Sequence, residues 1–183
     1  MRKVALIGLA PSSHDEAPVG DWECWGLPWD AWFPQYQRGF EMHPREHVLK
    51  PEARRPRDYL QRLRDAHTAI YMQQEWGDIR MSVRYPLEKI APLIDDYFGS
   101  SLAYMLAMAI HDEIEQIGVW GFDLDAEEEY AYQRPNAEYL IGFARGMGLK
   151  VYIPESSALC KFDGHIPLGT MQMNYPKRYG YLN

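Results

Sequence analysis

Short apolar runs alternate with longer amphipathic segments along the chain. Strands are predicted at residues 4–7, 21–25, 39–42, 68–72, 117–121 and 151–153. The runs at 4–7 and 117–121 carry apolar residues on both faces, which is typical of strands in a parallel sheet that is covered on two sides. Each run ends in glycine, proline or polar residues, so each predicted strand is short.

Three segments between these runs have helical periodicity. Residues 56–66 predict an exposed helix with a proline near its first turn. A helix beginning at Ser100 or Ser101 is apolar on almost every side through Ile110, which predicts burial against more than one neighbour. A third helix is predicted from Arg134, with its end marked by Gly148.

This alternation of strands and helices predicts an α/β fold: a single three-layer domain with a mainly parallel sheet. We place the domain at residues 1–162 and expect an irregular C-terminal arm at 163–183, which is rich in Gly, Pro and Tyr. Residues 75–85 interrupt the pattern, so they are predicted to form a loop near the functional face of the sheet.

Composition narrows the classes of function. The 183 residues carry a formal net charge of −7 and are 14% aromatic, which excludes a disordered chain. The negative excess falls entirely in residues 91–183, so nucleic acid is an unexpected partner. One local basic group is the exception, formed by Arg54, Arg55, Arg57, Arg62 and Arg64.

Further signals concern compartment and metal. Two cysteines form neither a disulfide framework nor a zinc site. No segment has the pattern of a signal peptide or the length of a membrane span. We therefore expect a cytoplasmic protein with no membrane partner and no metal, and leave a homo-oligomer open.

The loop after the first strand is the first candidate ligand site. Gly8, Ala10, Pro11, Ser12 and Ser13 combine small residues with two hydroxyls. Small residues let a phosphate or ribose approach the backbone, and the hydroxyls can bind its oxygens. The sequence is neither a Walker A loop nor Gly-x-Gly-x-x-Gly, so an ordinary tight turn is an equal alternative.

The second candidate ligand site is Gly99-Ser100-Ser101 at the start of the predicted helix. Free backbone amides, the serine hydroxyls and the helix dipole favour the binding of an anion there. Plain N-capping by serine is the simpler alternative. Tyr104 lies in the first turn of this helix, and Trp25 and Gly26 end the second strand; all three join the candidates for ligand contact. The tryptophans of the chain are stacking surfaces or core residues.

The third candidate follows the strand at 117–121, where Gly121, Asp123 and Asp125 occur. A carboxylate there can bind a ribose hydroxyl or a metal, or act as a base, although two alternating carboxylates are weak evidence for metal. Among the six histidines, His43 is the preferred general base because it ends a predicted strand and an imidazole titrates near neutral pH. Asp123 is the alternative base and otherwise suits a ribose hydrogen bond. His14 is second among the histidines.

These motifs together resemble known families. The order Gly8-x-Ala10-Pro11-Ser12, then Ser100-Ser101-x-x-Tyr104, then Gly121-x-Asp123 is similar to bacterial sialyltransferases of the campylobacter type and to MptE-like 6-hydroxymethylpterin pyrophosphokinases. The chain also resembles small Rossmann-fold proteins encoded by tailed phages, in the run from Phe98 to Pro154. The resemblance implies a Rossmann-like domain whose first loop and serine-rich helix start hold a nucleotide.

The departures bear on mechanism. The sialyltransferases carry an Asn after the second strand, where this chain has Gly26-Leu27-Pro28, and a catalytic His ahead of the last helix, where it has Tyr130 to Arg134 without a histidine. Arg134 in that interval is expected to pair with a donor phosphate, or alternatively with Glu127, Glu128 or Glu129. The sialyltransferases need no metal, so the resemblance assigns none here.

Three functions follow, in order of preference. The first is a transferase that moves a glycosyl or phosphoryl-type group from a nucleotide or nucleotide sugar, and the resemblance implies that it is phage-encoded. The second is a non-catalytic nucleotide-binding protein that sequesters a host signalling nucleotide. The third is an interaction protein whose Trp and Tyr loops bind another protein. The small-molecule partner in the first two is a nucleotide of unknown base.

Overall fold

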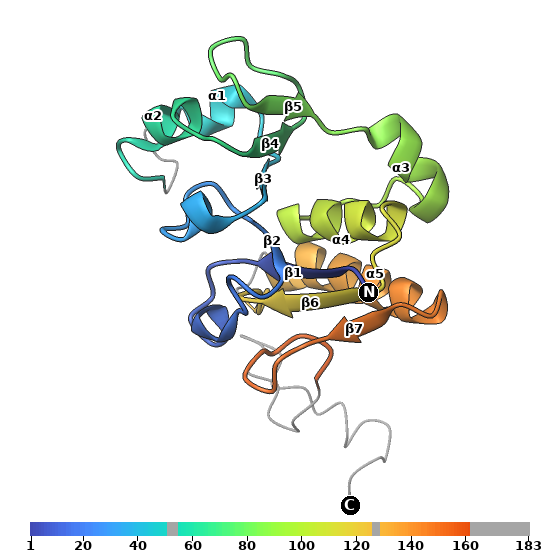
Figure 1. Ribbon diagram of the computed structural model, residues 1–183. Helices are drawn as coiled ribbons and strands as arrows, with labels where there is room; N and C mark the ends of the chain where they lie inside the picture. Colours follow the sequence, from blue (N-terminus) through green and yellow to red (C-terminus); the bar gives the residue numbers. More distant parts are fainter. Residues whose placement is uncertain (51–54, 126–128, 162–183) are drawn as a thin grey trace, which may run out of the picture.

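The computed structural model describes residues 1–50, 55–125 and 129–161 (Figure 1). Seven strands form one sheet: β1 (Lys3–Ile7), β2 (Glu23–Gly26), β3 (Arg38–Glu41), β4 (Ala69–Met72), β5 (Ser82–Arg84), β6 (Gln116–Trp120) and β7 (Lys150–Tyr152). Their order is β5-β4-β3-β2-β1-β6-β7, and every neighbouring pair is parallel. The predicted α/β class with a mainly parallel sheet is confirmed.

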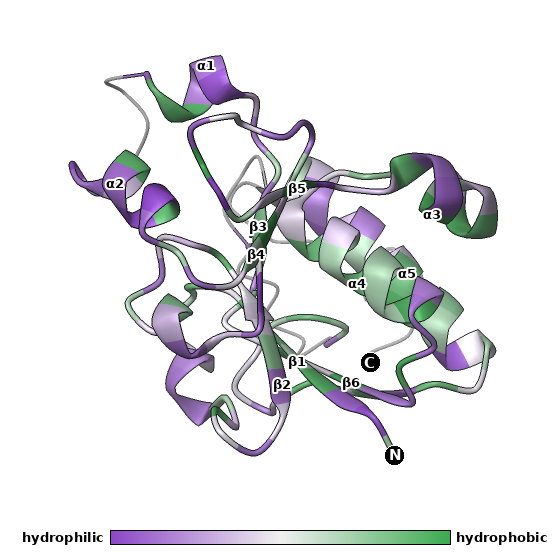
Figure 2. Ribbon diagram, turned by 45° about the horizontal axis from the view of Figure 1, so that its top comes forward, coloured by the Kyte–Doolittle hydropathy of each residue, from purple (hydrophilic) through white to green (hydrophobic). Residues whose placement is uncertain are grey.

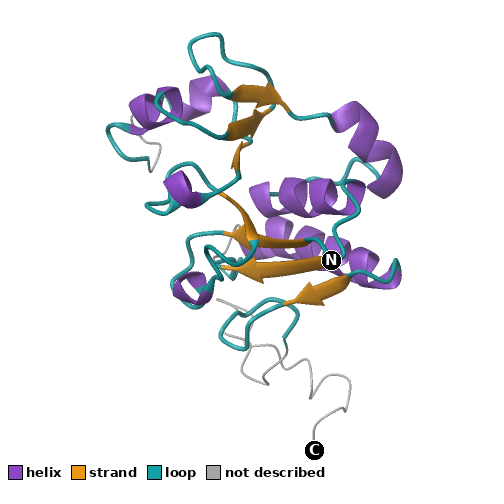
Figure 3. Cartoon of the chain, viewed as in Figure 1, coloured by secondary structure: helices purple, strands orange, loops and turns teal. Residues whose placement is uncertain are grey.

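Helices of very different lengths connect these strands (Figure 3). They are α1 (Arg45–Val48), α2 (Tyr59–Arg64), α3 (Leu87–Ile94), α4 (Ser101–His111) and α5 (Arg134–Gly146). Single turns occur at η1 (His14–Glu16), η2 (Phe33–Gln35) and η3 (Glu129–Gln133). The predicted C-terminal arm at 163–183 lies outside the described residues.

One prediction about the elements is wrong. Residues 75–85 were expected to be a loop, but they contain β5, which pairs with β4 from Ser82 to Arg84. Its Val83 and Arg84 are exposed at the edge of the sheet, so the segment lacks the apolar run that marks the inner strands. Helix α3 also escaped prediction, because Pro92 interrupts its pattern.

Two apolar layers cover the sheet. On one face α4 is packed against β1, β3 and α5. Eight residues of α4 between Leu102 and Ile110 are buried. Figure 2 shows that much of α4 is hydrophobic. The other face is covered by short elements, with Leu63 of α2, Phe33 of η2 and Trp76 in its core. The prediction that α4 is buried on more than one side is therefore correct.

Strand order locates the crevice of the sheet. The chain runs outward from β1 through β5, then returns to place β6 on the opposite side of β1. Loops that follow β1 and β6 therefore leave the same edge of the sheet, next to each other. Open parallel sheets bind ligands at the carboxyl ends of their strands, at such a change of direction.

Candidate functional site

The loops that follow β1 and β6 are joined by their backbones. The ladder that pairs Ile7 with Trp120 continues past the strands, because Gly8 N donates to Trp120 O at 2.8 Å and Ala10 N to Gly121 O at 2.7 Å. A Cβ on Gly8 would lie 2.3 Å from Gly121 O, and one on Gly121 would lie 2.5 Å from Gly8 O. Gly121 also has φ +65°, so both positions need glycine for the loops to approach each other.

The two serines of the first loop serve this same junction. Ser13 is buried, and its Oγ accepts a hydrogen bond from Gly121 N at 2.9 Å. Ser12 donates its hydroxyl proton to Asp123 Oδ1 at 2.8 Å, and Ala158 N donates to the same oxygen at 3.2 Å. Asp123 is thereby held in a fixed orientation, and in the described part of the chain its Oδ2 has no hydrogen-bond partner.

The N-terminus of α4 is positioned by a buried side chain of α5. Asn136 accepts a hydrogen bond from Gly99 N at 2.6 Å and donates one to Tyr97 O at 2.6 Å. Ser100 caps the helix, with its Oγ accepting from Ala103 N at 3.2 Å. Ser100 is therefore an N-cap of α4, as the simpler of the two sequence-based interpretations predicts. Among the described residues, the amides of Ser101 and Leu102 have no bonded acceptor, as expected for the first turn of a helix.

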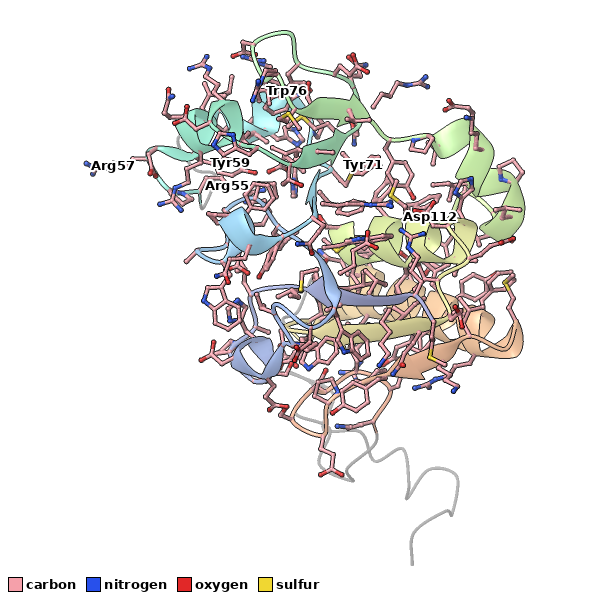
Figure 4. All side chains as sticks on the ribbon, in the orientation of Figure 1. Arg55, Arg57, Tyr59, Tyr71, Trp76 and Asp112 are labelled. Carbon is pink, nitrogen blue, oxygen red and sulfur yellow. The ribbon has the colours of Figure 1, made fainter. Side chains whose placement is uncertain are left out.

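The carboxyl end of β3 carries a cluster of polar side chains that contact one another. Glu41 is fully buried, and its Oε1 lies 2.6 Å from His43 Nδ1, while Tyr59 donates its hydroxyl proton to Oε2. Arg55 Nε lies 3.6 Å from Oε2. The Arg55 guanidinium is stacked on Trp29, 3.5 Å from the ring centroid. Figure 4 shows Arg55 and Tyr59 side by side, while Arg57 points away from the molecule.

The cluster affects the titration of its members. Burial alone would raise the pKa of Glu41, but hydrogen bonds from His43 and Tyr59, with the charges of His43 and Arg55, lower it below its usual range. Burial and the Glu41 carboxylate raise the pKa of Tyr59. Glu41 is therefore an ionised carboxylate and Tyr59 a neutral donor at neutral pH.

These three groups of residues surround one cavity of about 460 Å³, within the range of small-molecule sites. It is lined by Leu9, Ala10, Leu27, Trp29, His43, Arg55, Gly99, Ser100, Ser101, Gly121, Phe122, Asp123, Leu124, Asp125 and Gln133. Its walls come from the carboxyl ends of β1, β2, β3 and β6 and from the start of α4. Its lining includes the guanidinium of Arg55 and the carboxylates of Asp123 and Asp125.

The structure brings several sequence-predicted residues together here. Those that line the cavity are Ala10, His43, Ser100, Ser101, Gly121 and Asp123. Gly8, Ser12 and Ser13 lie directly behind the wall, at the junction between the two loops. Pro11 is exposed in the same loop but is not among the lining residues.

Four candidates lie elsewhere. Trp25 is fully buried in the core below α4, and Gly26 contacts the Tyr36 ring, so close that a Cβ would lie 2.4 Å from it. Tyr104 is stacked on Phe98, with ring centroids 4.6 Å apart. Arg134 donates to Glu138 Oε1 at 2.9 Å and to Ala158 O at 2.6 Å. Glu127, Glu128 and the Glu129 side chain, its alternative partners, lie outside the described residues.

His14, the second candidate histidine, is bonded at both ring nitrogens. Its Nδ1 lies 2.8 Å from Asp15 Oδ1 and its Nε2 lies 2.9 Å from the buried Asp30 Oδ2. Burial alone would lower the pKa of His14, but the hydrogen bonds and charges of Asp15 and Asp30 raise it. With both nitrogens facing carboxylates, His14 ties the first loop to the loop after β2.

Sequence reasoning missed the partners of His43. In the sequence, Arg55 stands out only as part of a basic group, and Trp29 only as one of several tryptophans. Glu41 could have been noticed, since a carboxylate two residues before a histidine lies on the same side of an extended strand. Arg55 and Tyr59 carried no such signal, because their contacts with Glu41 form only in the folded chain.

The described residues include neither a cluster of metal ligands nor a membrane-spanning helix. In the described ranges, no three His, Cys, Asp or Glu side chains are grouped as metal ligands would be. None of the helices in those ranges has the length and apolar character to cross a membrane.

Comparisons with known proteins gave one similarity. No family model and no curated protein matches the chain. Among solved structures it is similar to the sialyltransferase CstII from Campylobacter jejuni, solved in complex with a substrate analogue, cytidine 5′-monophosphate. The match has 13% sequence identity and a TM-score of 0.49, and covers 84% of this chain and 79% of the other. No residue role is carried over from it.

Proposed function

We propose that this protein binds a nucleotide in the cavity at the β1–β6 crevice and transfers a glycosyl or phosphoryl-type group from it. The supporting observation is the composition of the cavity wall. The lining includes the start of α4 with its unbonded amides, Arg55 and His43 from the segments after β3, and Asp123 and Asp125 from the loop after β6. A nucleotide needs an anion site, hydroxyl acceptors and apolar surface within one pocket of this size.

The start of α4 suits the phosphates. The amides of Ser101 and Leu102 are free to donate, and the helix dipole places positive potential there. Arg55 lines the cavity with its guanidinium; because its buried Nε faces Glu41 Oε2 at 3.6 Å, a phosphate would be bound through the Nη atoms. Guanidinium and helix amides together bind a phosphate more strongly than either alone.

The carboxylates after β6 suit the ribose. Asp123 Oδ1 is occupied by Ser12 and Ala158, which fixes the side chain and leaves Oδ2 for a hydroxyl. Asp125 lines the same wall and is exposed. Leu9, Leu27, Phe122 and Leu124 add the apolar surface on which a base or sugar ring packs.

In this proposal His43 is the general base. It lines the cavity and its side chain is 47% exposed, so an acceptor hydroxyl can reach it. The acceptor gives its proton to the imidazole as its oxygen bonds to the transferred group, and the bond between that group and the nucleotide breaks. The departing phosphate charge is stabilised at the start of α4.

The experiment is a binding panel of nucleoside mono- and diphosphates and nucleotide sugars, measured by thermal shift and calorimetry. Arg55→Lys keeps the charge beside Glu41 but loses the guanidinium geometry, and should weaken binding by about 10–100-fold. Arg57→Ala is the matched control, because Arg57 is exposed and points away from the cavity (Figure 4). It should leave affinity unchanged.

Two outcomes would redirect the proposal. If no nucleotide binds the wild-type protein, the nucleotide site is wrong, and a protein-binding role replaces it. If a nucleotide binds tightly but its sugar or phosphate is never transferred or hydrolysed, the protein sequesters nucleotides without catalysis.

A further inference from the structure

Glu41 is a fully buried carboxylate that its cluster keeps charged. Its side chain has 0% exposure, yet it lies at the end of β3 next to a cavity-lining histidine. Burying a carboxylate is costly unless it is paired and hydrogen-bonded. Tyr59 and Arg55 provide that compensation on Oε2, while Oε1 accepts from the backbone N of His43 at 3.1 Å and contacts its ring at 2.6 Å.

The imidazole of His43 has two neighbours that demand opposite tautomers. Glu41 Oε1 can only accept, so a bond at 2.6 Å requires a proton on Nδ1. Arg55 Nη2 can only donate, and it lies 3.0 Å from the same nitrogen, which would require a bare Nδ1. The Glu41 carboxylate is closer to Nδ1 than the Arg55 guanidinium is, and its negative charge strengthens a hydrogen bond donated by an N–H group. The bond to Glu41 is therefore the stronger of the two.

We propose that Glu41 is a positioning residue that fixes His43 in the Nδ1–H tautomer, so that Nε2 is the atom that accepts a proton in the cavity. Within the described residues Nε2 has no hydrogen-bond partner. The inference rests on the proposed function for its reaction, and it adds the substrate class: an acceptor alcohol or water, whose O–H proton passes to Nε2.

The same contact accounts for the charge that develops during transfer. When Nε2 takes the proton, His43 becomes an imidazolium whose Nδ1–H faces an ionised carboxylate. Glu41 stabilises that cation, and Tyr59 and Arg55 hold Glu41 so that it cannot rotate away. The arrangement is that of a base oriented by a third group, assembled from β3 and the segment that leads into α2.

The first measurement needs no substrate. Nitrogen-15 NMR of histidine-labelled protein at pH 8.5, where an ordinary imidazole is neutral, distinguishes the two tautomers. The His43 signal is assigned as the one lost in His43→Ala. We expect an Nδ1–H pattern in the wild type. An Nε2–H pattern would mean that Arg55 controls the ring, and would overturn the proposal.

The second measurement removes the carboxylate. Glu41→Gln offers an amide that can donate to Nδ1 as well as accept, so the Nε2–H form should become populated. Tyr59→Phe retains the Glu41–His43 contact and should keep the Nδ1–H form. Glu46→Gln, at an exposed position of α1, is the matched control. An unchanged tautomer in folded Glu41→Gln protein would show that Glu41 does not set it.

Turnover then separates this inference from the proposed function. With the nucleotide sugars of the panel and water as acceptor, Glu41→Gln should lower kcat by about 10–10³-fold with KM little changed. If nothing in the panel binds, the proposed function fails while the tautomer result still decides the role of Glu41. If turnover is present and equal in both proteins, the positioning role is wrong although the nucleotide site is correct.

Discussion

At the scale of single residues, the sequence predicts that Gly8 lets a ligand approach the backbone, but in the structure Gly8 and Gly121 let two loops approach each other. Any side chain at Gly121 meets the carbonyl of Gly8 and adopts a left-handed φ of +65°. Gly121→Ala should therefore lower the free energy of unfolding by about 2–4 kcal/mol, as measured by urea denaturation.

Gly142 supplies the control for this substitution. It lies on the exposed side of α5, and a Cβ there meets nothing within 4 Å. Gly142→Ala should raise the stability by about 0.5–1 kcal/mol, because alanine loses less backbone freedom in a helix. Equal effects at the two positions would show that close approach is not what requires glycine after β6.

His14 predicts a dependence of stability on pH. Asp15 and Asp30 raise the pKa of His14 in the folded chain above its pKa in the unfolded chain. The protonated His14 therefore contributes its full stabilisation at pH values below the unfolded-state pKa. This stabilisation is lost as the pH rises through the folded-state pKa. His14→Gln should therefore cost about 1–2 kcal/mol at pH 5.5 and less at pH 9. Unfolding free energies of both proteins at the two pH values test this, and a cost that grows with pH would refute the ion pair.

At the scale of elements, the start of α4 separates two roles of serine. Both serines line the cavity, but Ser100 also caps the helix through Ala103 N, whereas Ser101 makes no cap. Ser100→Ala should lower stability by about 1 kcal/mol, measured by denaturation. Ser101→Ala should leave stability nearly unchanged but weaken nucleotide binding in calorimetry. Unchanged binding in Ser101→Ala would mean that the Ser101 hydroxyl does not contact the nucleotide and that only the backbone amides can serve there.

The elements that could be predicted from the sequence are those with a local signal. Strands β1 and β6 have apolar residues on both faces and are buried at four of five positions each, and the apolar helix α4 is buried at eight of eleven. The edge strand β5 has no such run, and α1 is a single turn whose formation depends on its neighbours. Of the candidate site, the loops after β1, β3 and β6 were predictable because parallel strands end at one edge.

At the scale of the molecule, the rest of the site depends on strand order, which sequence pattern does not specify. Arg55 and Trp29 belong to the part of the chain that runs outward from β1, while Ser101 and Asp123 belong to the part after the return. They meet only because β6 is paired with β1. Trp25 and Tyr104, which are close in sequence to lining residues, point into the core instead.

This arrangement predicts how a bound nucleotide changes the dynamics of the chain. A nucleotide that contacts both the outward part of the chain and the part after the return should slow amide hydrogen exchange in each. We expect protection at residues 27–43 in the first part and at residues 99–104 and 121–125 in the second. The region around Glu113 and Gly148 lies at the opposite ends of these elements and should be unaffected. Hydrogen exchange followed by mass spectrometry, with and without a nucleotide from the binding panel, measures this directly. Protection confined to residues 99–125 would mean that the ligand contacts α4 and β6 alone, and that Arg55 and His43 serve the stability of β3 rather than binding.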